Sequence, residues 1–479
     1  MIFLLKYGKM KFEVKKMKKF KAVLACAVSA VILAGCTVVE TDFPSDQSSV
    51  IEESSEINQS SETNESSSSG SSSSTPKKEP SKEPESSEPE YAAFFREKKV
   101  HEMNIEIAPE DWSKMVNNPY SKTPRRVNIT IDGITINDAG IHPRGKTQLY
   151  LGVAYNLRLP YKIKFDEFVD GGSFMGLDEI ALDNSACDAS NIRQLVGMEA
   201  MRALGVDAPY VTFFNVSVNG KLHGFYSGIE AVDSSYLERV FGSHKHSLYK
   251  SVKNANLTPG MKKDAFEQKK GSDESRADLQ RLIQVLDETP LGEKGEIEDI
   301  IDVDLVLKTL AVDAVVHNWD NYAGEVCHNF YLYMSGGKFR IIPWDLNEIF
   351  LQTEAGERSG PGSKQDIISP ITGYTSEKKR PLVQKLMAVD EYYKKYIDYC
   401  EQCTNWLKNF YETELGTYKE FLEEYHDNDP TKFYKTEYFN RQFDETNRNG
   451  ITGFIKERIE YLSKRIPEIR EEKGLAGNE

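Results

Sequence analysis

Hydrophobic and polar residues alternate along much of the chain between residues 100 and 230. Alternation with a period of two places every second side chain on one face and predicts strands that are buried on one side. The dipeptides Asp132-Gly133 and Asn219-Gly220 each separate two such runs and are typical of tight hairpin turns. The first half of the chain is therefore expected to be rich in β-structure. The expected strands are 100–107, 126–131, a run from 134 onward, 161–165, 176–182, 211–218 and 224–230.

Helical periodicity interrupts this pattern and then replaces it. A short helix is expected at 109–115, and a longer one at 191–204 that ends at Gly205. Beyond residue 270 one further hairpin is expected, but most of the chain has helical spacing. The helices expected there are 272–287, 297–319, 380–425 and 441–473, the last broken or kinked at Gly450 and Pro467. A β-rich half followed by a helical half predicts an α+β enzyme with two lobes.

The first 36 residues have the pattern of an export signal. Five lysines between residues 15 and 21 precede an apolar stretch, 22–33, that is too short to cross a membrane comfortably. The stretch ends in Leu33-Ala34-Gly35-Cys36, which resembles the lipobox of bacterial lipoproteins. Residues 1–36 are therefore expected to be a signal peptide, and the mature chain to be extracytoplasmic, anchored to the bacterial cell membrane by a lipid on Cys36. An ordinary signal peptide with an incidental cysteine is the alternative, and Met17 is an alternative start.

Residues 37–90 have the composition of a disordered stalk. From about residue 46 they are mostly Ser, Glu, Pro, Lys and Asn, with almost no large apolar side chains. Such a segment cannot bury enough surface to offset the entropy of ordering. The serine run 66–74, interrupted only by Gly70, is typical of a flexible tether. The globular domain is expected at 91–479, held at some distance from the membrane.

Charge and cysteine content narrow the possible functions. The formal net charge is -15, from 75 acidic and 60 basic residues, which argues against a nucleic-acid partner because phosphate backbones require a basic surface. The six cysteines do not form the pattern of a disulfide scaffold. Cys400 and Cys403 form a lone C-x-x-C, which is weak evidence for a zinc or redox site. They are expected to lie on a helix surface, with a local disulfide or thiol pair as the alternative.

The densest polar cluster follows the helix expected at 297–319. Asp320 lies at the end of that helix and Asp345 just past the second strand of the hairpin. The hairpin between them can bring the two carboxylates together, and carboxylate and amide oxygens suit Mg²⁺ or Mn²⁺. The alternatives are that each Asp caps a turn, or that the pair serves a glycosidase. The glycosidase interpretation does not explain the basic strand described next.

A second cluster is basic. Arg144 follows one expected strand, and Lys162 and Lys164 are two apart in the next, so they share one face. Like charges on one face need solvent or an anionic partner. The pattern is therefore compatible with a solvated strand face or with a phosphate-binding site. Glu230, at the end of another strand, is expected to pair with one of the lysines.

These segments follow one another in an order that resembles the CotH family of atypical, spore-coat-type protein kinases. No single segment decides the resemblance, which rests on their order over about residues 139–350. The segments are Pro143-Arg144-Gly145, 160–165, Asn219-Gly220, Gly224-Phe225-Tyr226 with Glu230, Asp320-Asn321-Tyr322, 328–333 and 342–345.

The resemblance implies a reduced kinase-like fold without the usual glycine-rich loop. It implies a metal-dependent enzyme that transfers the γ-phosphoryl group of ATP to Ser or Thr of proteins. The chain's own stalk is a candidate acceptor, because it is Ser-rich and tethered at a high local concentration. Asp320 resembles the residue that orients the acceptor hydroxyl. Asp345 resembles the ligand of Mg²⁺ or Mn²⁺, with Asn329 and Asn347 as further ligands.

The resemblance also assigns the ATP phosphates to the basic cluster. Arg144 and either Lys162 or Lys164 are expected to hold them, and Glu230 to orient the lysine. The segments depart from the family pattern at Lys146, where an Asn is usual, and at Asn347, where an Asp is usual. Together with the scarcity of ATP outside a membrane, these departures favour the alternative of a catalytically weak, kinase-like surface adhesin or scaffold.

Overall fold

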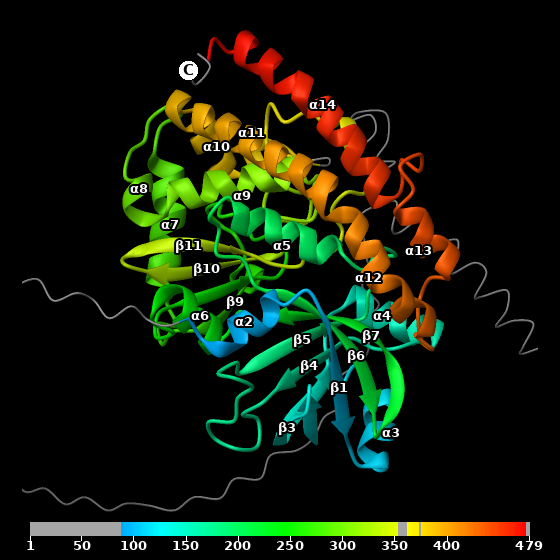
Figure 1. Cartoon of the computed structure of the whole chain (residues 1–479). Helices are drawn as coiled ribbons and strands as arrows, with labels where there is room; N and C mark the ends of the chain where they lie inside the picture. The colour runs from blue at the N-terminus through cyan, green and yellow to red at the C-terminus, as the bar shows by residue number, and fades with distance from the viewer. Residues whose placement is uncertain (1–87, 353–361, 373–374, 476–479) are drawn as a thin grey trace, which may run out of the picture. The chain divides into compact units, whose positions relative to one another are not determined.

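The computed structural model describes residues 88–352, 362–372 and 375–475 (Figure 1). The predicted signal peptide, the lipidation site Cys36 and residues 37–87 of the predicted stalk lie outside these residues. Glu90 begins the first described helix, one residue before the predicted start of the domain. Among the described residues, no helix is both long enough and apolar enough to span a membrane.

Seven strands of the first half close into a barrel, in the order β1-β2-β3-β4-β5-β7-β6. The strands are β1 (Val100–Glu106), β2 (Arg125–Ile131), β3 (Ile134–Pro143), β4 (Tyr161–Lys164), β5 (Glu179–Asp183), β6 (Val211–Val218) and β7 (Lys221–Glu230). β1 pairs in parallel with β6, whereas the other neighbours are antiparallel. Alternate residues point inward, as at Ile105 and Ile129, which lie opposite one another and are fully buried. The predicted strands are thus confirmed, and the closure into a barrel comes from the long-range pairing of β1 with β6.

Both predicted hairpin turns have the backbone that their sequences favour. Asp132 and Gly133 have φ angles of 45° and 86°, and Asn219 and Gly220 have 50° and 76°. Positive φ at both central residues is characteristic of the hairpin turn whose twist matches that of the flanking strands. These turns therefore set the registers of β2 with β3 and of β6 with β7.

A second sheet of four antiparallel strands has the order β11-β10-β8-β9. Its strands are β8 (Leu248–Ser251), β9 (Phe266–Lys270), β10 (Phe330–Ser335) and β11 (Lys338–Pro343). The β10–β11 hairpin was expected from the sequence, but β8 and β9 were not. β8 is only four residues long and β9 is mostly polar, so neither has a recognisable alternation; β8 is defined by its pairing with β10.

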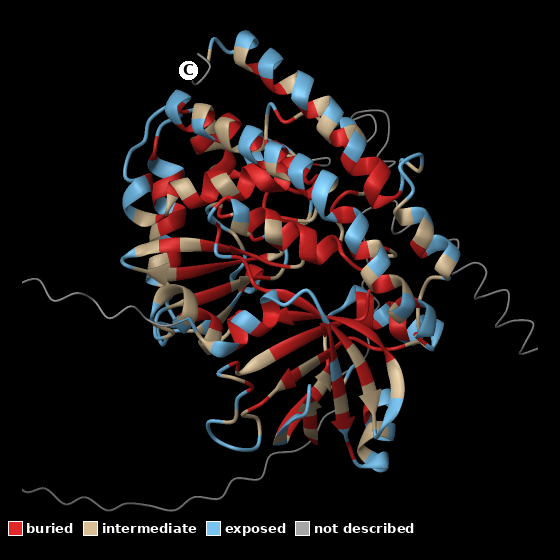
Figure 2. Ribbon diagram, viewed as in Figure 1, coloured by how far each residue is buried: buried red, intermediate tan, exposed pale blue. Residues whose placement is uncertain are grey.

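Helices pack around this second sheet and supply most of a large hydrophobic core (Figure 2). A separate core fills the barrel. Near the barrel lie α2 (Glu90–Arg96), α3 (Pro109–Asn117) and α4 (Thr147–Tyr155). The remaining helices are α5 (Arg193–Ala203), α6 (Ser234–Phe241), α7 (Ala277–Glu288), α8 (Ile297–Ile300), α9 (Val303–Val315), α10 (Pro381–Met387), α11 (Asp390–Thr413), α12 (Leu415–Asn428), α13 (Thr436–Gln442) and α14 (Ile451–Glu472), with short 3-10 turns at Lys263–Ala265, Gly362–Lys364 and Glu377–Lys379.

Local capping divides the long helices that the sequence predicts. The predicted helix 297–319 is α8 followed by α9, because the Asp302 side chain accepts a hydrogen bond from the Leu305 N–H (3.0 Å) and starts a new helix. Gly450 precedes α14 and breaks the predicted helix 441–473, whereas Pro467 lies inside α14 without ending it.

The two C-x-x-C cysteines are placed differently from the prediction. Cys400 and Cys403 do lie on one helix, α11, but both are fully buried rather than on its surface. Both are free thiols, and burial raises the pKa of Cys400 to about 12. A buried neutral thiol packs as a small apolar group, so these cysteines belong to the core.

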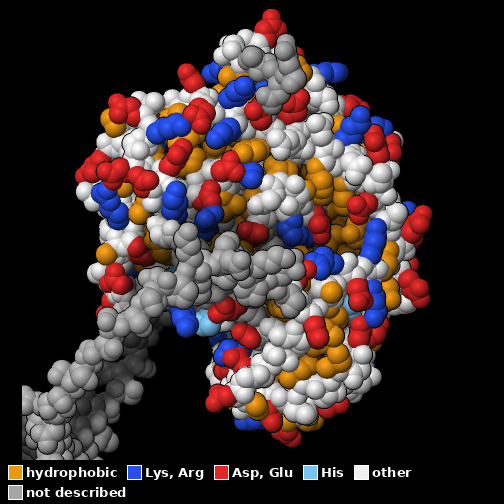
Figure 3. Space-filling model, turned by 60° about the vertical axis from the view of Figure 1, so that its left-hand side comes forward, with side chains coloured by type: hydrophobic (Ala, Val, Ile, Leu, Met, Phe, Trp, Pro, Cys, Tyr) orange, Lys and Arg blue, Asp and Glu red, His pale blue; other side chains and the backbone are white. Residues whose placement is uncertain are grey.

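The described residues confirm a mixed α+β class. On the face drawn in Figure 3, acidic and basic side chains are interspersed and no broad basic area is visible among the described residues.

Candidate active site

Asp320 is held by a chain of buried polar groups that begins in α9. The Asn318 side chain donates to the Asp313 carboxylate (2.8 Å), and its own oxygen accepts from the Asp320 N–H (3.2 Å). Asn321 in turn donates to the Asn318 carbonyl (3.0 Å). Asp313, Asn318 and Asn321 are all nearly inaccessible to solvent. The loop after α9 is thus fixed by side chains rather than by regular structure.

The Asp320 carboxylate itself contacts two residues that immediately precede β10. One oxygen hydrogen-bonds His328 Nε2, and the other accepts from Asn329 Nδ2 at 3.0 Å. Burial opposes charging of the His328 ring, but the bond to Asp320 outweighs it and the pKa of His328 is raised. Because the side-chain NH₂ group of Asn329 donates to Asp320, the side-chain oxygen Oδ1 of Asn329 remains available to another ligand.

Asp345 lies beside Asn329 at the same end of the β10–β11 hairpin. The Trp344 N–H donates to the Asn329 carbonyl (3.1 Å), which ties the residue before Asp345 to the residue that bonds Asp320. Asp345 has a φ of 60°, in the left-handed region that non-glycine residues seldom adopt. Its carboxylate forms no hydrogen bond or ion pair with the other residues that the structure describes. Residues whose backbone is held in such a sparsely populated region cluster at functional sites.

Four carboxyl groups act on one another here. Burial raises the pKa of Asp345, the Arg144 charge opposes this, and the charges of Asp183 and Asp320 add to it. Burial and the charges of Asp320 and Asp345 also raise the pKa of Glu348 to about 7. Asp320 and Asp345 therefore lie close enough for their charges to interact, and Arg144 partly offsets the charge of Asp345.

The two lysines of β4 share one face, as predicted, and each has acidic partners. Lys162 Nζ lies 2.5 Å from the Glu179 carboxylate on β5. Lys164 Nζ lies 3.3 Å from Asp166 and 3.4 Å from Glu167. Lys162 is thus positioned by a glutamate that the sequence pattern did not identify.

The predicted pairing of Glu230 with one of these lysines is wrong. Glu230 is fully buried and its oxygens accept hydrogen bonds from Tyr91 (2.8 Å) and from the Tyr210 N–H (2.9 Å). Arg239 in α6 donates to both oxygens, at 2.9 and 2.6 Å. Glu230 pairs with Ile180 across β5–β7, whereas Lys162 pairs with Ala181 across β4–β5. Its role is to fix α2 and α6 to the barrel.

Arg144 extends from the barrel toward the acidic cluster. Its backbone N–H donates to the Pro160 carbonyl (2.9 Å), which fixes the turn after β3. The guanidinium carbon lies 5.8 Å from the centre of the Trp344 ring, next to Asp345. Its Nη1 atom is buried and has no hydrogen-bond partner in the described parts of the chain. An unpartnered donor at this position suits an anionic ligand.

Comparison with known proteins decides the family. A model of the family described as CotH kinase protein matches residues 141–462. The chain belongs to this family. The match includes Arg144, Asp320 and Asp345, and it continues through the helices as far as α14. The CotH resemblance of the motifs is thus confirmed, and the family match extends through most of the helical part.

One curated relative and two solved structures illustrate the range of likeness. Inner spore coat protein H of Bacillus subtilis (strain 168) is 27% identical over 313 residues, or 62% of this chain and 81% of that protein. The Helicobacter pylori proinflammatory kinase CtkA is 10% identical with a TM-score of 0.27, covering 70% of this chain and 95% of that one. A Shewanella oneidensis MR-1 HipA–HipB–operator DNA complex gives 10% identity and a TM-score of 0.28, covering 62% and 61%. These two structural likenesses are too weak to support an argument about the site.

The residues expected to hold a metal in this CotH protein fit such an ion in part. No group of three or more His, Cys, Asp or Glu side chains suited to a metal occurs within residues 88–352, 362–372 and 375–475. Asp345 has an unpaired carboxylate, however, and Asn329, whose backbone carbonyl accepts from the neighbouring Trp344 N–H, has an unused side-chain oxygen. Mg²⁺ is commonly held by one or two carboxylates together with substrate phosphates and water. The donor set suits an ion that arrives with a phosphate ligand.

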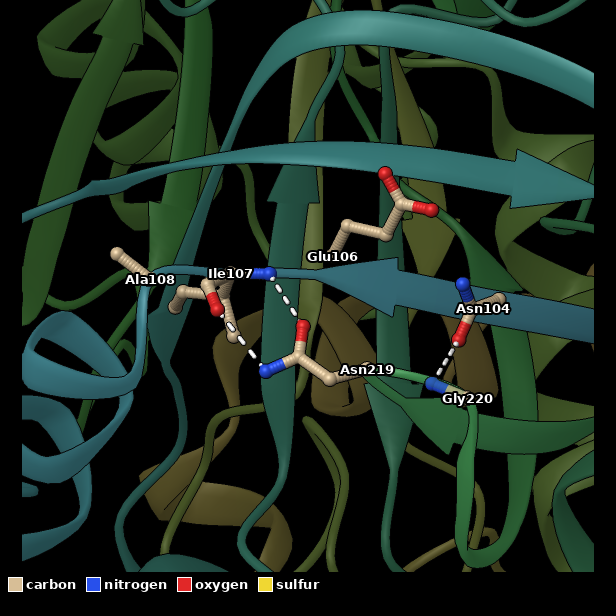
Figure 4. Close-up of a pocket in the computed structure, with 6 residues that line it drawn as sticks. All are labelled: Asn104, Glu106, Ile107, Ala108, Asn219 and Gly220. Carbon is tan, nitrogen blue, oxygen red and sulfur yellow. Dashed lines mark hydrogen bonds between the residues drawn. The ribbon is translucent and has the colours of Figure 1, made fainter.

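A surface pocket in the barrel is distinct from this site. It is lined by Asn104, Glu106, Ile107, Ala108, Asn219 and Gly220 (Figure 4). The Asn219 side chain accepts from the Ile107 N–H and donates to the Ile107 carbonyl, both at 2.9 Å. The Gly220 N–H donates to the Asn104 side chain (3.0 Å). These three hydrogen bonds join the β6–β7 turn to the β1 segment.

Proposed function

We propose that this CotH-family protein is a metal-dependent protein kinase that transfers the γ-phosphoryl group of ATP to Ser or Thr hydroxyls. The observation that carries the proposal is the meeting of Asp320 and Asp345 at one end of the β10–β11 hairpin, with Arg144 reaching toward them from the barrel. We also propose a two-lobed, kinase-like arrangement of the barrel and the helical part. The separate hydrophobic cores of the two parts support it.

In the proposed reaction Asp320 orients the acceptor hydroxyl. The hydroxyl oxygen forms a bond to the γ-phosphorus while the bond to the β,γ-bridging oxygen breaks, and ADP leaves. The hydroxyl proton passes to the Asp320 carboxylate. His328 and Asn329 hold that carboxylate in place, and such positioning is the main contribution of a kinase because the transfer needs little covalent help.

Charge neutralisation is assigned to the residues around Asp345. Asp345, Asn329 and Asn347 would hold Mg²⁺ or Mn²⁺, which supplies positive charge to the phosphates when bound. Arg144 donates hydrogen bonds to phosphate oxygens. Lys162, held by Glu179, reproduces the lysine–glutamate pair that many kinases use for the α- and β-phosphates. Lys164 has two acidic partners of its own and is less available.

The proposed location is the outer side of a bacterial membrane. A signal peptide at residues 1–36, lipidation of Cys36 and a stalk at 37–90 would hold the kinase near that surface. The relative from Bacillus subtilis is named as an inner spore coat protein, which supports a role outside the cytoplasm. We further propose the serine run 66–74 as an acceptor, because a tethered segment reaches a high effective concentration.

A second candidate is a kinase-like surface adhesin or scaffold with weak activity or none. It is favoured by Asn347, which replaces a carboxylate usual at that position, and by the single carboxylate in the proposed donor set. Measurement of the melting temperature of the full chain, in detergent micelles, with ATP and Mn²⁺ or Mg²⁺ separates the two candidates. The kinase proposal predicts a rise that Asp345→Asn abolishes and that the exposed control Asp170→Asn keeps. No ATP-dependent rise in the wild type would leave the adhesin or scaffold.

A further inference from the structure

Lys250 is a half-buried lysine on the second sheet that none of the roles above uses. It lies in β8, opposite Tyr331 of β10 and Glu267 of β9, so these three side chains share one face of the sheet. Ile342 of β11 lies opposite Tyr331, and Trp344 is two residues further along. This face of the sheet therefore leads toward Asp345.

The Lys250 ammonium rests on aromatic rings instead of on a carboxylate. Its Nζ lies 5.5 Å from the centre of the Tyr331 ring and 5.6 Å from that of Trp344. Glu267, the acid opposite it, is paired with Lys269 at 2.9 Å. No hydrogen bond or ion pair joins the Lys250 ammonium to another residue in the described part of the chain. This distinguishes it from Lys162, which has a carboxylate within 2.5 Å.

A second cation approaches the same indole ring. The Arg144 guanidinium lies 5.8 Å from the Trp344 ring centre, and its buried Nη1 lacks a partner among the described residues. Burial, and then the Arg144 charge, lower the pKa of Lys250 to about 8. Two cations that face a shared ring without a fixed counter-charge are unfavourable in the free protein. Asp345 only partly offsets them.

We propose that Lys250 is a further nucleotide-binding residue. Its ammonium and the Arg144 guanidinium together bind phosphate groups of the nucleotide beside Trp344 and Asp345. A polyphosphate supplies the missing negative charge and meets both the ammonium and the unpartnered Nη1 donor. The alternative is that Lys250 is satisfied by the aromatic rings alone. That alternative accounts for the lysine but not for the empty donor of Arg144. The proposal rests on the proposed kinase function and names a residue that it did not include.

Calorimetric titration of the full chain with ATP and Mn²⁺ tests the proposal. Lys250→Met keeps the length of the side chain and removes its charge, and Lys253→Met removes an exposed lysine three residues away. We expect the dissociation constant for ATP to rise at least tenfold in Lys250→Met and to stay within twofold in Lys253→Met. The melting temperature without ligand should not fall in Lys250→Met, because the variant removes an unpaired, partly desolvated charge.

The outcomes are separable. Wild-type affinity for ATP in Lys250→Met would overturn the inference and leave the proposed function intact. A melting temperature of free Lys250→Met well below that of the wild type would show a packing role and also overturn it. Absence of ATP binding by the wild type would instead defeat the proposed function, and the inference with it.

Discussion

Asn318→Ala is expected to slow phosphoryl transfer while leaving the binding of the nucleotide unchanged. The side chain lies between Asp313, to which it donates at 2.8 Å, and the Asp320 N–H, from which it accepts at 3.2 Å. Its removal leaves the Asp320 loop without the group that fixes its first turn. A displacement of about 1 Å in a positioned group can cost about 10²-fold in rate. We therefore expect kcat to fall about 10²-fold, while the KM for ATP stays within twofold.

Asn318→Ala should also lower the free energy of unfolding, and by more at high pH than at low pH. Burial raises the pKa of Asp313 to about 7, and the bond from Asn318 opposes this rise. The rise from the ordinary pKa of 3.8 corresponds to on the order of 4 kcal/mol in the free energy of unfolding, at about 1.4 kcal/mol per unit of pKa. Because the folded-state pKa is raised, this stability is fully present below pH 4 and is lost as the pH rises through 7.

Loss of the Asn318 donor raises the pKa of Asp313 further and extends that loss to higher pH. Urea unfolding should therefore show a penalty of about 1–3 kcal/mol for Asn318→Ala near pH 8 and a smaller one near pH 5. Asn405→Ala, at an exposed position of α11, is the matched control and should change neither kcat nor stability. An unchanged kcat in Asn318→Ala, or a KM for ATP that rises in proportion to the fall in kcat, would refute the positioning argument.

Two further predictions concern charged pairs, and a third concerns the metal. Glu179→Gln should raise the KM for ATP about fivefold, or about 1 kcal/mol for a partly exposed pair, because Lys162 loses its positioning carboxylate; steady-state kinetics showing no change would remove that role. Glu230→Gln should lower the free energy of unfolding by about 3–5 kcal/mol, because it leaves the Arg239 charge buried without its partner, and it should change the ATP affinity by less than twofold. A selective loss of ATP affinity in calorimetry would instead favour the predicted role of Glu230 as the partner of a phosphate-binding lysine. Chelation of divalent ions should remove the ATP-dependent rise in melting temperature, and a rise that persists in excess EDTA would argue against a metal-dependent site.

The elements that were predictable are those with local signals. The strands of the barrel have clear alternation, and the type of both hairpin turns follows from Asn-Gly and Asp-Gly. The pairing of β1 with β6, which closes the barrel, joins segments far apart in the sequence and leaves no local trace. β8 could not be seen for the same reason, and Lys250 was therefore missed with it.

The site was predictable where residues follow the ends of regular elements. Asp320 follows α9 and Asp345 follows β11, and only the β10–β11 hairpin lies between the two residues. Sequence order therefore nearly determines that they lie close together. The partner of Lys162 was not predictable in this way, because it depends on which strands are neighbours in the barrel. Glu179 lies on β5, which pairs with β4, whereas Glu230 lies on β7, one strand further away.

Incorporation of label from γ-labelled ATP into protein tests the central claim most directly. The full chain with Mn²⁺ or Mg²⁺ should label Ser or Thr residues, and mass spectrometry of the products would show whether the run 66–74 is among them. We expect Asp320→Asn and Asp345→Asn each to lower the rate of labelling by about 10²-fold or more, and Asp170→Asn to label as the wild type does. Wild-type labelling by Asp345→Asn, or no labelling by the wild type with either metal, would contradict the proposed kinase function.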